Sequence, residues 1–295
     1  MKKYLFLISI IIFCSIYYNK TNKNKENQHI KSGNSYIKKG KYKMAINLYK
    51  KSIKKDITNA IAYNNLGITY YRNKEYINAL SSYDKSIQIN SKYIEVYYNR
   101  SNAFIELQQW KNSLTDLMII EKKYKNTKKI YSLIGITKAG LIEYKEALLY
   151  FLKSLSKLKY MSKNSEIYYN IGAIYYLTKN YKLSELFIKK SIHTNLKNPN
   201  NYNILSMIEF KKKKYKNALI LINKAIKIDN NESFFYNNKG YIYIKKKKFK
   251  KSKKNINKSI NMNHQNTWAY KNKGILYFKK KKYNISKRLF RNLKK

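Results

Sequence analysis

The side chains best suited to catalysis or metal binding are few in this chain and stand far apart. The three histidines are His29, His193 and His264, and no acidic or nucleophilic pattern recurs beside them. Cys14 is the single cysteine, so no intrachain disulfide and no cysteine pair for a metal can form. Glycine-rich phosphate loops and His-Glu metal spacings are also absent from the sequence. The sequence therefore predicts a non-catalytic protein without a cofactor.

Lysine is the other residue type whose abundance and position could serve a function. The chain has 64 basic and 15 acidic residues, for a formal charge of +49. An AT-rich coding sequence would explain many lysines but not the scarcity of Asp and Glu, so we expect anionic surroundings. Three tetralysines recur at one place in successive copies of a repeat. They are Lys211, Lys212, Lys213 and Lys214, then Lys245, Lys246, Lys247 and Lys248, and finally Lys279, Lys280, Lys281 and Lys282.

These twelve residues, the lysine ladder, have two interpretations. Stacked repeats would align them on one edge that attracts anionic lipid headgroups, an acidic protein or another polyanion, with affinity falling as salt rises. Nucleic acid is the less favoured partner, because the N-terminal segment directs the chain away from the cytosol. Alternatively, the lysines form a solvated edge at helix C-termini, where positive charge complements the helix dipole.

A regular repeat organises the chain from Glu26 onward. Small residues recur at Gly33, Gly67, Ser101, Gly135, Gly172, Ser206, Gly240 and Gly274. Their spacing is constant except between the fourth and fifth, where it is slightly longer. In the second copy, Tyr76, Ala79 and Tyr83 follow at spacings that the other copies share. The pattern predicts two amphipathic helices joined by a turn at residues 73–75, which must be buried against neighbouring copies.

The pattern resembles the tetratricopeptide repeat family over residues 26–295, because that family has a period of about 34 residues with this order of small and bulky positions. The resemblance implies an all-α, right-handed superhelical solenoid of antiparallel helix pairs. Its eight units would start near residues 26, 60, 94, 128, 165, 199, 233 and 267. The proline that usually ends a unit is missing throughout, and the last unit stops at Lys295, short of a full repeat and without a polar capping helix. Self-association through residues 283–295 is therefore one expectation.

The resemblance also implies that the first helices line a concave groove for a peptide or protein. Groove residues would occupy the second, fifth, sixth, ninth, twelfth and thirteenth places of each unit. Amides at the sixth place would hold a ligand backbone, and apolar residues at the ninth and twelfth places would form the floor. The candidates are Asn65, Ile68, Tyr71, Asn99, Ile136, Asn170, Ala173, Tyr176, Met207, Phe210, Asn238, Tyr241, Asn272, Ile275 and Phe278. Alternatively, these residues belong to the core between repeats.

The clamp with which some family members grip a C-terminal carboxylate is absent. Asn34 and Asn65 match its amides, but Ile30, Glu95 and Asn99 occupy the basic places. The remaining partner hypotheses are therefore a protein or peptide in the groove and an anionic polymer or membrane surface on the lysine ladder. Retention of groove binding at high salt would separate the two.

Residues 1–20 predict export towards or across a membrane. Two lysines precede an uncharged run at residues 4–18, the pattern of a secretory signal or signal anchor. The run is short for a membrane span, and no small-residue cleavage site follows it. We expect an uncleaved anchor followed by a polar linker at residues 21–25, with a cleaved or lipid-anchored form as alternatives. Cys14 would accept the lipid, although the bulky residues before it depart from the lipoprotein pattern.

Overall fold

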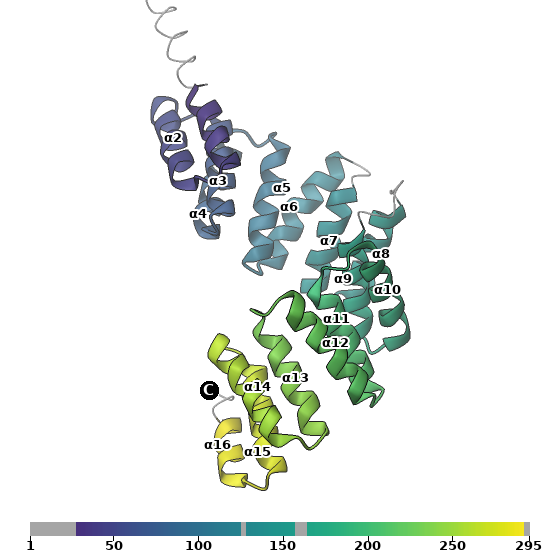
Figure 1. Cartoon of the computed structure of the whole chain (residues 1–295). Coiled ribbons are helices and arrows are strands. Elements are labelled where there is room, and N and C mark those ends of the chain that lie inside the picture. Colours follow the sequence, from purple (N-terminus) through teal and green to yellow (C-terminus); the bar gives the residue numbers. More distant parts are fainter. Residues whose placement is uncertain (1–27, 125–127, 157–163, 292–295) are drawn as a thin grey trace, which may run out of the picture. The chain divides into compact units, whose positions relative to one another are not determined.

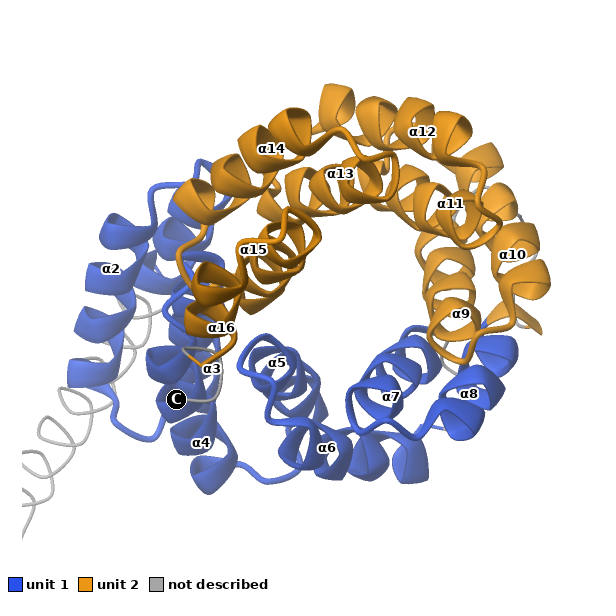
Figure 2. Ribbon diagram, turned by 90° about the horizontal axis from the view of Figure 1, so that it is seen from below, with its two compact units in different colours: residues 1–154 blue, residues 155–295 orange. Residues whose placement is uncertain are grey.

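The computed structural model describes residues 28–124, 128–156 and 164–291. Within these ranges the regular structure is helical, without strands, and successive helices pack as antiparallel pairs (Figure 1). The predicted all-α solenoid is confirmed. The chain divides into two compact units, residues 1–154 and 155–295 (Figure 2).

The first unit begins with helical residues 28–38 and continues through seven further helices, the last of which ends just inside the second unit. These helices are α2 (Tyr42–Lys55), α3 (Ala60–Arg72), α4 (Tyr76–Ile89), α5 (Ile94–Glu106), α6 (Trp110–Lys123), α7 (Lys128–Gly140) and α8 (Tyr144–Ser156).

The second unit continues the alternation of first and second helices. Its helices are α9 (Ser165–Leu177), α10 (Tyr181–Thr194), α11 (Pro199–Lys211), α12 (Tyr215–Ile228), α13 (Ser233–Lys245), α14 (Phe249–Met262), α15 (Thr267–Lys279) and α16 (Tyr283–Arg291). Figure 2 shows α11, α13 and α15 along the inner side of this unit, with α12 and α14 outside them. The inner helices contact their neighbours directly, α11 with α13 and α13 with α15.

The recurring glycine allows the two helices of a pair to pack closely. A Cβ atom on Gly67 in α3 would lie 2.5 Å from the ring of Tyr83 in α4, and Tyr83 is buried. Gly274 and Phe290 repeat this relationship in the last pair, at 2.8 Å. Because heavy atoms cannot approach so closely, a side chain at either glycine would displace the ring. The small residue and the bulky residue sixteen places later therefore form one packing unit.

The turn inside each pair is a Schellman motif. At the end of α3, the Glu75 N–H donates to the Tyr70 carbonyl at 2.9 Å and the Lys74 N–H to the Tyr71 carbonyl at 3.0 Å. Lys74 has a φ of 63°, the left-handed conformation that glycine adopts most easily. The equivalent residues in the tetralysine turns, Lys213, Lys247 and Lys281, have φ values of 62°, 55° and 59°. The tetralysines thus form the turns themselves.

An ion pair between the half-buried Arg100 and the buried Asp116 joins α5 to α6 in the first unit. The Arg100 guanidinium donates from Nε and Nη2 to the two carboxylate oxygens of Asp116, at 2.8 and 2.7 Å. Its Nη1 donates to Asp84 Oδ1 in α4 at 2.6 Å. Burial opposes the charged form of Arg100, but hydrogen bonds to Asp116 and Asp84 outweigh it and raise the pKa of Arg100. Arg100 therefore links three helices.

The predicted N-terminal segment, with Cys14 and the linker at residues 21–25, lies outside the described residues. The same is true of residues 292–295 at the other end. Among the helices that the structure does describe, none combines the length and apolar character needed to cross a membrane.

Candidate functional site

The predicted groove residues divide between the two units. Asn65, Ile68, Tyr71, Asn99 and Ile136 lie on α3, α5 and α7 of the first unit, where each is half-buried. The other ten belong to the second unit. Each unit therefore carries its own set of predicted residues, and a pocket on the inner helices of the second unit gathers several of them.

This pocket lies between the inner helices α11, α13 and α15 and has a volume of about 390 Å³. Five of the sequence-predicted residues line it: Met207, Asn238, Tyr241, Asn272 and Ile275. They come from three successive repeats, so the regular repeat spacing brings them together through the stacking of the first helices. We call this site the inner pocket.

Five further residues of the inner pocket were not among the predicted ones. They are Phe234, Asn237, Asn266, Trp268 and Lys271. Trp268 is 65% exposed, Phe234 is 38% exposed, and the Lys271 Nζ lies 4.8 Å from the centre of the Trp268 ring. Phe234 and Trp268 occupy the second place of their repeats, and Asn237 and Lys271 occupy the fifth place. These places were expected to face the groove, which is the signal that could have identified all four residues.

The amides at the sixth place also have a structural role. The Nδ2 of Asn238 donates to Oδ1 of Asn203 in the preceding repeat at 2.8 Å, and Asn272 does the same to Asn237 at 2.8 Å. In the first unit, Asn99 donates to Asn64 at 3.0 Å. These three bonds tie α13, α15 and α5 to the first helix of the preceding repeat. In each pair, the Nδ2 of the sixth-place amide and the Oδ1 of its partner are thus already hydrogen-bonded before any ligand binds.

The aromatic residues at the twelfth place contact the aromatic residue that opens the second helix of their own pair, and Phe210 also contacts Tyr241 of the next repeat, with ring centres 5.0 Å apart. Tyr71 lies against Tyr76 with ring centres 5.5 Å apart, and Phe210 against Tyr215 at 5.6 Å. Burial, together with the nearby Glu106 carboxylate, raises the pKa of Tyr71 to about 12. Phe210 is buried in the core of the second unit, as the core alternative expects.

Three more predicted residues, Asn170, Ala173 and Tyr176, lie half-buried on α9 and do not line the inner pocket. Tyr176 repeats the twelfth-place pairing, because its ring centre is 5.7 Å from that of Tyr181. A groove role for these three residues stays a prediction.

The lysine ladder is exposed, apart from a half-buried Lys246. Its first tetralysine is partly neutralised, because the Lys212 Nζ donates to Glu185 at 2.6 Å and to Glu209 at 3.3 Å. The hydrogen bond to Glu185 is the largest cause of the raised pKa of Lys212. In the second tetralysine, Lys245 lies 6.0 Å from the centre of the Tyr241 ring. The ladder is therefore not uniform along its length.

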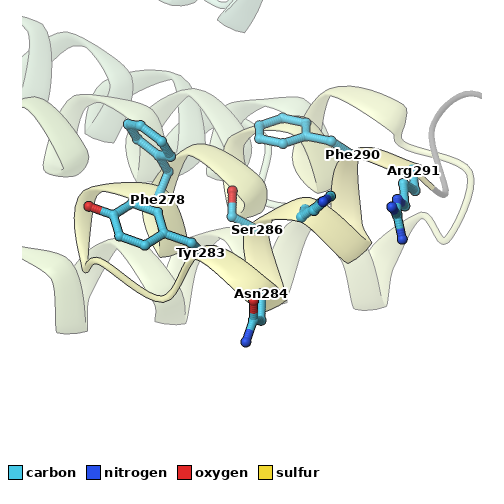
Figure 3. Close-up of a pocket in the computed structure, with 7 residues that line it drawn as sticks. Phe278, Tyr283, Asn284, Ser286, Phe290 and Arg291 are labelled. Atoms are coloured by element: carbon cyan, nitrogen blue, oxygen red, sulfur yellow. The ribbon is translucent and has the colours of Figure 1, made fainter.

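The last helix pair presents another apolar hollow of about 640 Å³, lined by Phe278, Tyr283 and Phe290 of α15 and α16; Figure 3 shows the rings of Phe278 and Tyr283 beside each other. Phe278 and Tyr283 are both more than half exposed. Phe278 is thus the one predicted groove residue that lies on this face. Self-association through it stays a prediction.

The candidate catalytic side chains are not brought together. Within the described ranges, no group of three or more His, Cys, Asp or Glu residues could hold a metal ion. His29 is half-buried, and burial together with Lys55 and Lys51 lowers its pKa. His193 and His264 lie exposed on the surface of the second unit.

The stacked helix pairs define a helical repeat protein, and the inner pocket of its second unit is lined by aromatic and amide side chains. A TPR repeat model matches residues 33–74, and tetratricopeptide repeat models match residues 60–93, 165–198, 199–232 and 235–266. Together these matches cover more than half of the chain. The chain belongs to the tetratricopeptide repeat family, whose members act as protein-interaction scaffolds.

Comparison with known proteins supports this fold. The chain is 33% identical over 95 residues to serine/threonine-protein phosphatase 5 of Rattus norvegicus, which covers 32% of this chain and 19% of the phosphatase. It is 28% identical over 155 residues to a TPR repeat-containing protein of Methanocaldococcus jannaschii, covering 50% of this chain and 26% of that protein. The chain thus spans about a quarter or less of these relatives.

Among solved structures, a tetratricopeptide repeat protein from Parabacteroides merdae superposes with a TM-score of 0.70 at 18% identity. The superposition covers 88% of this chain and 98% of that one. The APC/C hetero-tetramer Cut9-Hcn1 superposes with a TM-score of 0.68 at 14% identity, over 83% of this chain and 46% of that one. At these identities the likeness establishes the fold alone.

Proposed function

We propose that this protein is a non-catalytic scaffold that holds a peptide or protein segment in the inner pocket. The observation that supports the proposal is the convergence of Met207, Tyr241 and Ile275 from three repeats around one hollow. The pocket size suits one or two side chains of an extended segment. Trp268 and Phe234 at its mouth offer apolar area that loses water when a partner binds.

The test compares two matched glutamate substitutions on exposed apolar residues. Phe234→Glu changes the inner pocket, whereas Ile220→Glu changes the outer helix α12, where Ile220 is 60% exposed. Each variant is used for affinity capture from the native cell extract at high salt. We expect the first to lose the specific partner and the second to keep it. Equal capture by both variants would exclude the inner pocket as the binding site.

A second candidate function is binding of an anionic polymer or membrane surface by the lysine ladder. It is favoured by three exposed turns whose lysines share one position in successive repeats. Replacing Lys245–Lys248 by glutamates should abolish retention on heparin and on phosphatidylserine vesicles, and retention by the wild type should fall steeply with salt. The matched control replaces the exposed Lys50, Lys51, Lys54 and Lys55 of α2. An equal loss of retention in that control would mean that the total charge of the chain, and not the lysine ladder, causes the binding.

For the N-terminal segment we propose membrane attachment or export. The support is the sequence pattern of Lys2 and Lys3 followed by the uncharged run at residues 4–18. Cell fractionation with alkaline extraction should leave the full chain in the membrane pellet, and mass spectrometry of its N-terminus would reveal cleavage. Retention that disappears in Cys14→Ser would identify lipidation. Full-length protein recovered only in the soluble cytosolic fraction would exclude the proposal.

A further inference from the structure

The charge of this chain is strongly segregated along its length. All 15 acidic residues lie between Glu26 and Glu232. Residues 233–295 contain 19 Lys, 2 Arg and no Asp or Glu. Codon bias towards lysine does not by itself remove carboxylates, because the preceding repeats are also rich in lysine and retain Asp and Glu. The two helix pairs α13–α14 and α15–α16 therefore form a body in which side-chain carboxylates are absent.

Several of the carboxylates upstream have cationic partners. Glu185 and Glu209 hold Lys212, and Asp84 and Asp116 hold Arg100. No equivalent side chain exists after Glu232 to neutralise the lysines of α13 to α16. Two of the three helices around the inner pocket belong to this unneutralised body. From this charge distribution we expect a positive potential at the pocket, which favours an anionic occupant.

The chemistry of the pocket lining limits what kind of anion fits. Only one of its residues, Lys271, is charged, and four are asparagines. A nucleic acid strand carries a charge at every nucleotide and needs cations all along its path, whereas the ladder lysines lie in the turns at the helix ends. A flat lipid surface cannot enter a hollow between helices. An occupant with a few carboxylates beside an apolar side chain matches one lysine, several amides and two exposed aromatic rings.

We infer that the inner pocket takes an acidic peptide segment, with an aromatic or aliphatic side chain seated between Phe234 and Trp268 and a neighbouring carboxylate on Lys271. This inference rests on the proposed groove function and names the chemistry of its partner. Lys271 already lies over the Trp268 ring at 4.8 Å, so one residue pair presents an apolar face and a cation together. Trp268 and Lys271 are thereby the specificity-determining residues.

The experiment is a selection of random linear peptides displayed on phage, with the full chain immobilised in mild detergent. The same selection runs in parallel on the double variant Trp268→Ala/Lys271→Glu. We expect the wild type to enrich sequences in which Asp or Glu adjoins Phe, Leu or Trp, and the double variant not to enrich them. A synthetic copy of an enriched peptide should bind Lys271→Glu about tenfold more weakly, the loss of one charge-assisted hydrogen bond.

Lys253→Glu is the matched control, because Lys253 is exposed on the outer helix α14 of the same basic body. It should change the affinity of that peptide by less than about twofold at physiological salt, where distant charges are screened. Equal weakening by both variants would mean that total charge, and not the pocket, selects acidic peptides, and the inference would fail.

Two other results separate this inference from the function on which it rests. Enriched peptides that are neutral or basic, yet lost in Trp268→Ala, would keep the groove function and reject the acidic partner. Absence of any enrichment over the double variant would reject both. Single-stranded oligodeoxythymidine that binds more tightly than the selected peptides, and needs Trp268 to do so, would overturn the inference in favour of nucleic acid.

Discussion

Asn272 in α15 and Asn237 in α13 lie in neighbouring repeats and are joined directly through their side chains. The Nδ2 of Asn272 donates to the Oδ1 of Asn237 at 2.8 Å, and both side chains are buried. The bond fixes how far α15 is shifted along α13, because an amide pair tolerates little sliding. Both residues line the inner pocket, so the contact that sets the repeat register also shapes the site.

Asn237→Ala should lower the free energy of unfolding by about 1–3 kcal/mol, since it leaves the buried Nδ2 of Asn272 without its partner. The double variant Asn237→Ala/Asn272→Ala should cost less than the sum of the single changes, because the orphaned group is removed. Urea unfolding of all three variants measures this. Asn284→Ala, at an exposed position of α16, is the control and should be nearly neutral. Strict additivity would contradict a direct contribution from the bond.

The two carboxylates that accept hydrogen bonds from Arg100 should contribute very differently to the free energy of unfolding. Asp116 is 1% exposed and Asp84 is 59% exposed. Asp116→Ala should therefore cost about 3–5 kcal/mol by leaving the half-buried Arg100 guanidinium without its main partner. Asp84→Ala should cost less than about 1 kcal/mol, as solvent-exposed ion pairs do. Chemical denaturation monitored by circular dichroism provides both values, and similar costs would show that burial does not govern this cluster.

Replacing the lysines that have a left-handed backbone conformation in the tetralysine turns by glycine should stabilise the fold. Lys247→Gly should raise stability by about 1 kcal/mol, because it relieves the steric cost of a Cβ atom in that conformation. The neighbouring Lys246 has a φ of −81°, so Lys246→Gly loses the same charge without that gain. Thermal unfolding of the two variants separates conformation from charge. A gain in both would point to relief of lysine repulsion instead.

Alkaline pH should destabilise the chain through the buried Tyr49 and the half-buried Tyr71. Burial raises the pKa of Tyr49 to about 12, against the opposing effect of Arg72, and the pKa of Tyr71 is also about 12. An unfolded tyrosine titrates near pH 10. Below that pH both states are protonated and the stabilisation is complete. As pH rises from about 10 towards 12 the unfolded chain loses protons first, so stability falls.

A tyrosinate absorbance titration followed beside circular dichroism checks this prediction. The absorbance of the buried tyrosines should rise together with the loss of helix, and Tyr49→Phe should remove part of the delayed titration. Ordinary titration of every tyrosine near pH 10 with the helices intact would contradict it.

The regular repeat spacing was sufficient to predict the helix pairs, because a small residue and a bulky residue sixteen places later define a local packing unit. Gly67 beneath Tyr83 is the contact that this spacing anticipates. The turn at residues 73–75 was also predicted, although the left-handed φ of Lys74 was not. A lysine does not indicate a left-handed turn from its residue type, whereas Gly40, at the same place in the first repeat, does.

The sequence by itself thus determined the all-α repeat fold, since that fold follows from contacts within one repeat and a spacing that recurs. Tertiary structure alone decided which sixth-place amides pair with a preceding repeat, why Phe210 is buried, and that Trp268 and Lys271 meet at the mouth of the inner pocket. It also decided that Lys212 is held by Glu185. The physical reason is that these properties depend on neighbours in adjacent helices and repeats and on exposure to water, neither of which a residue type at a repeat position encodes.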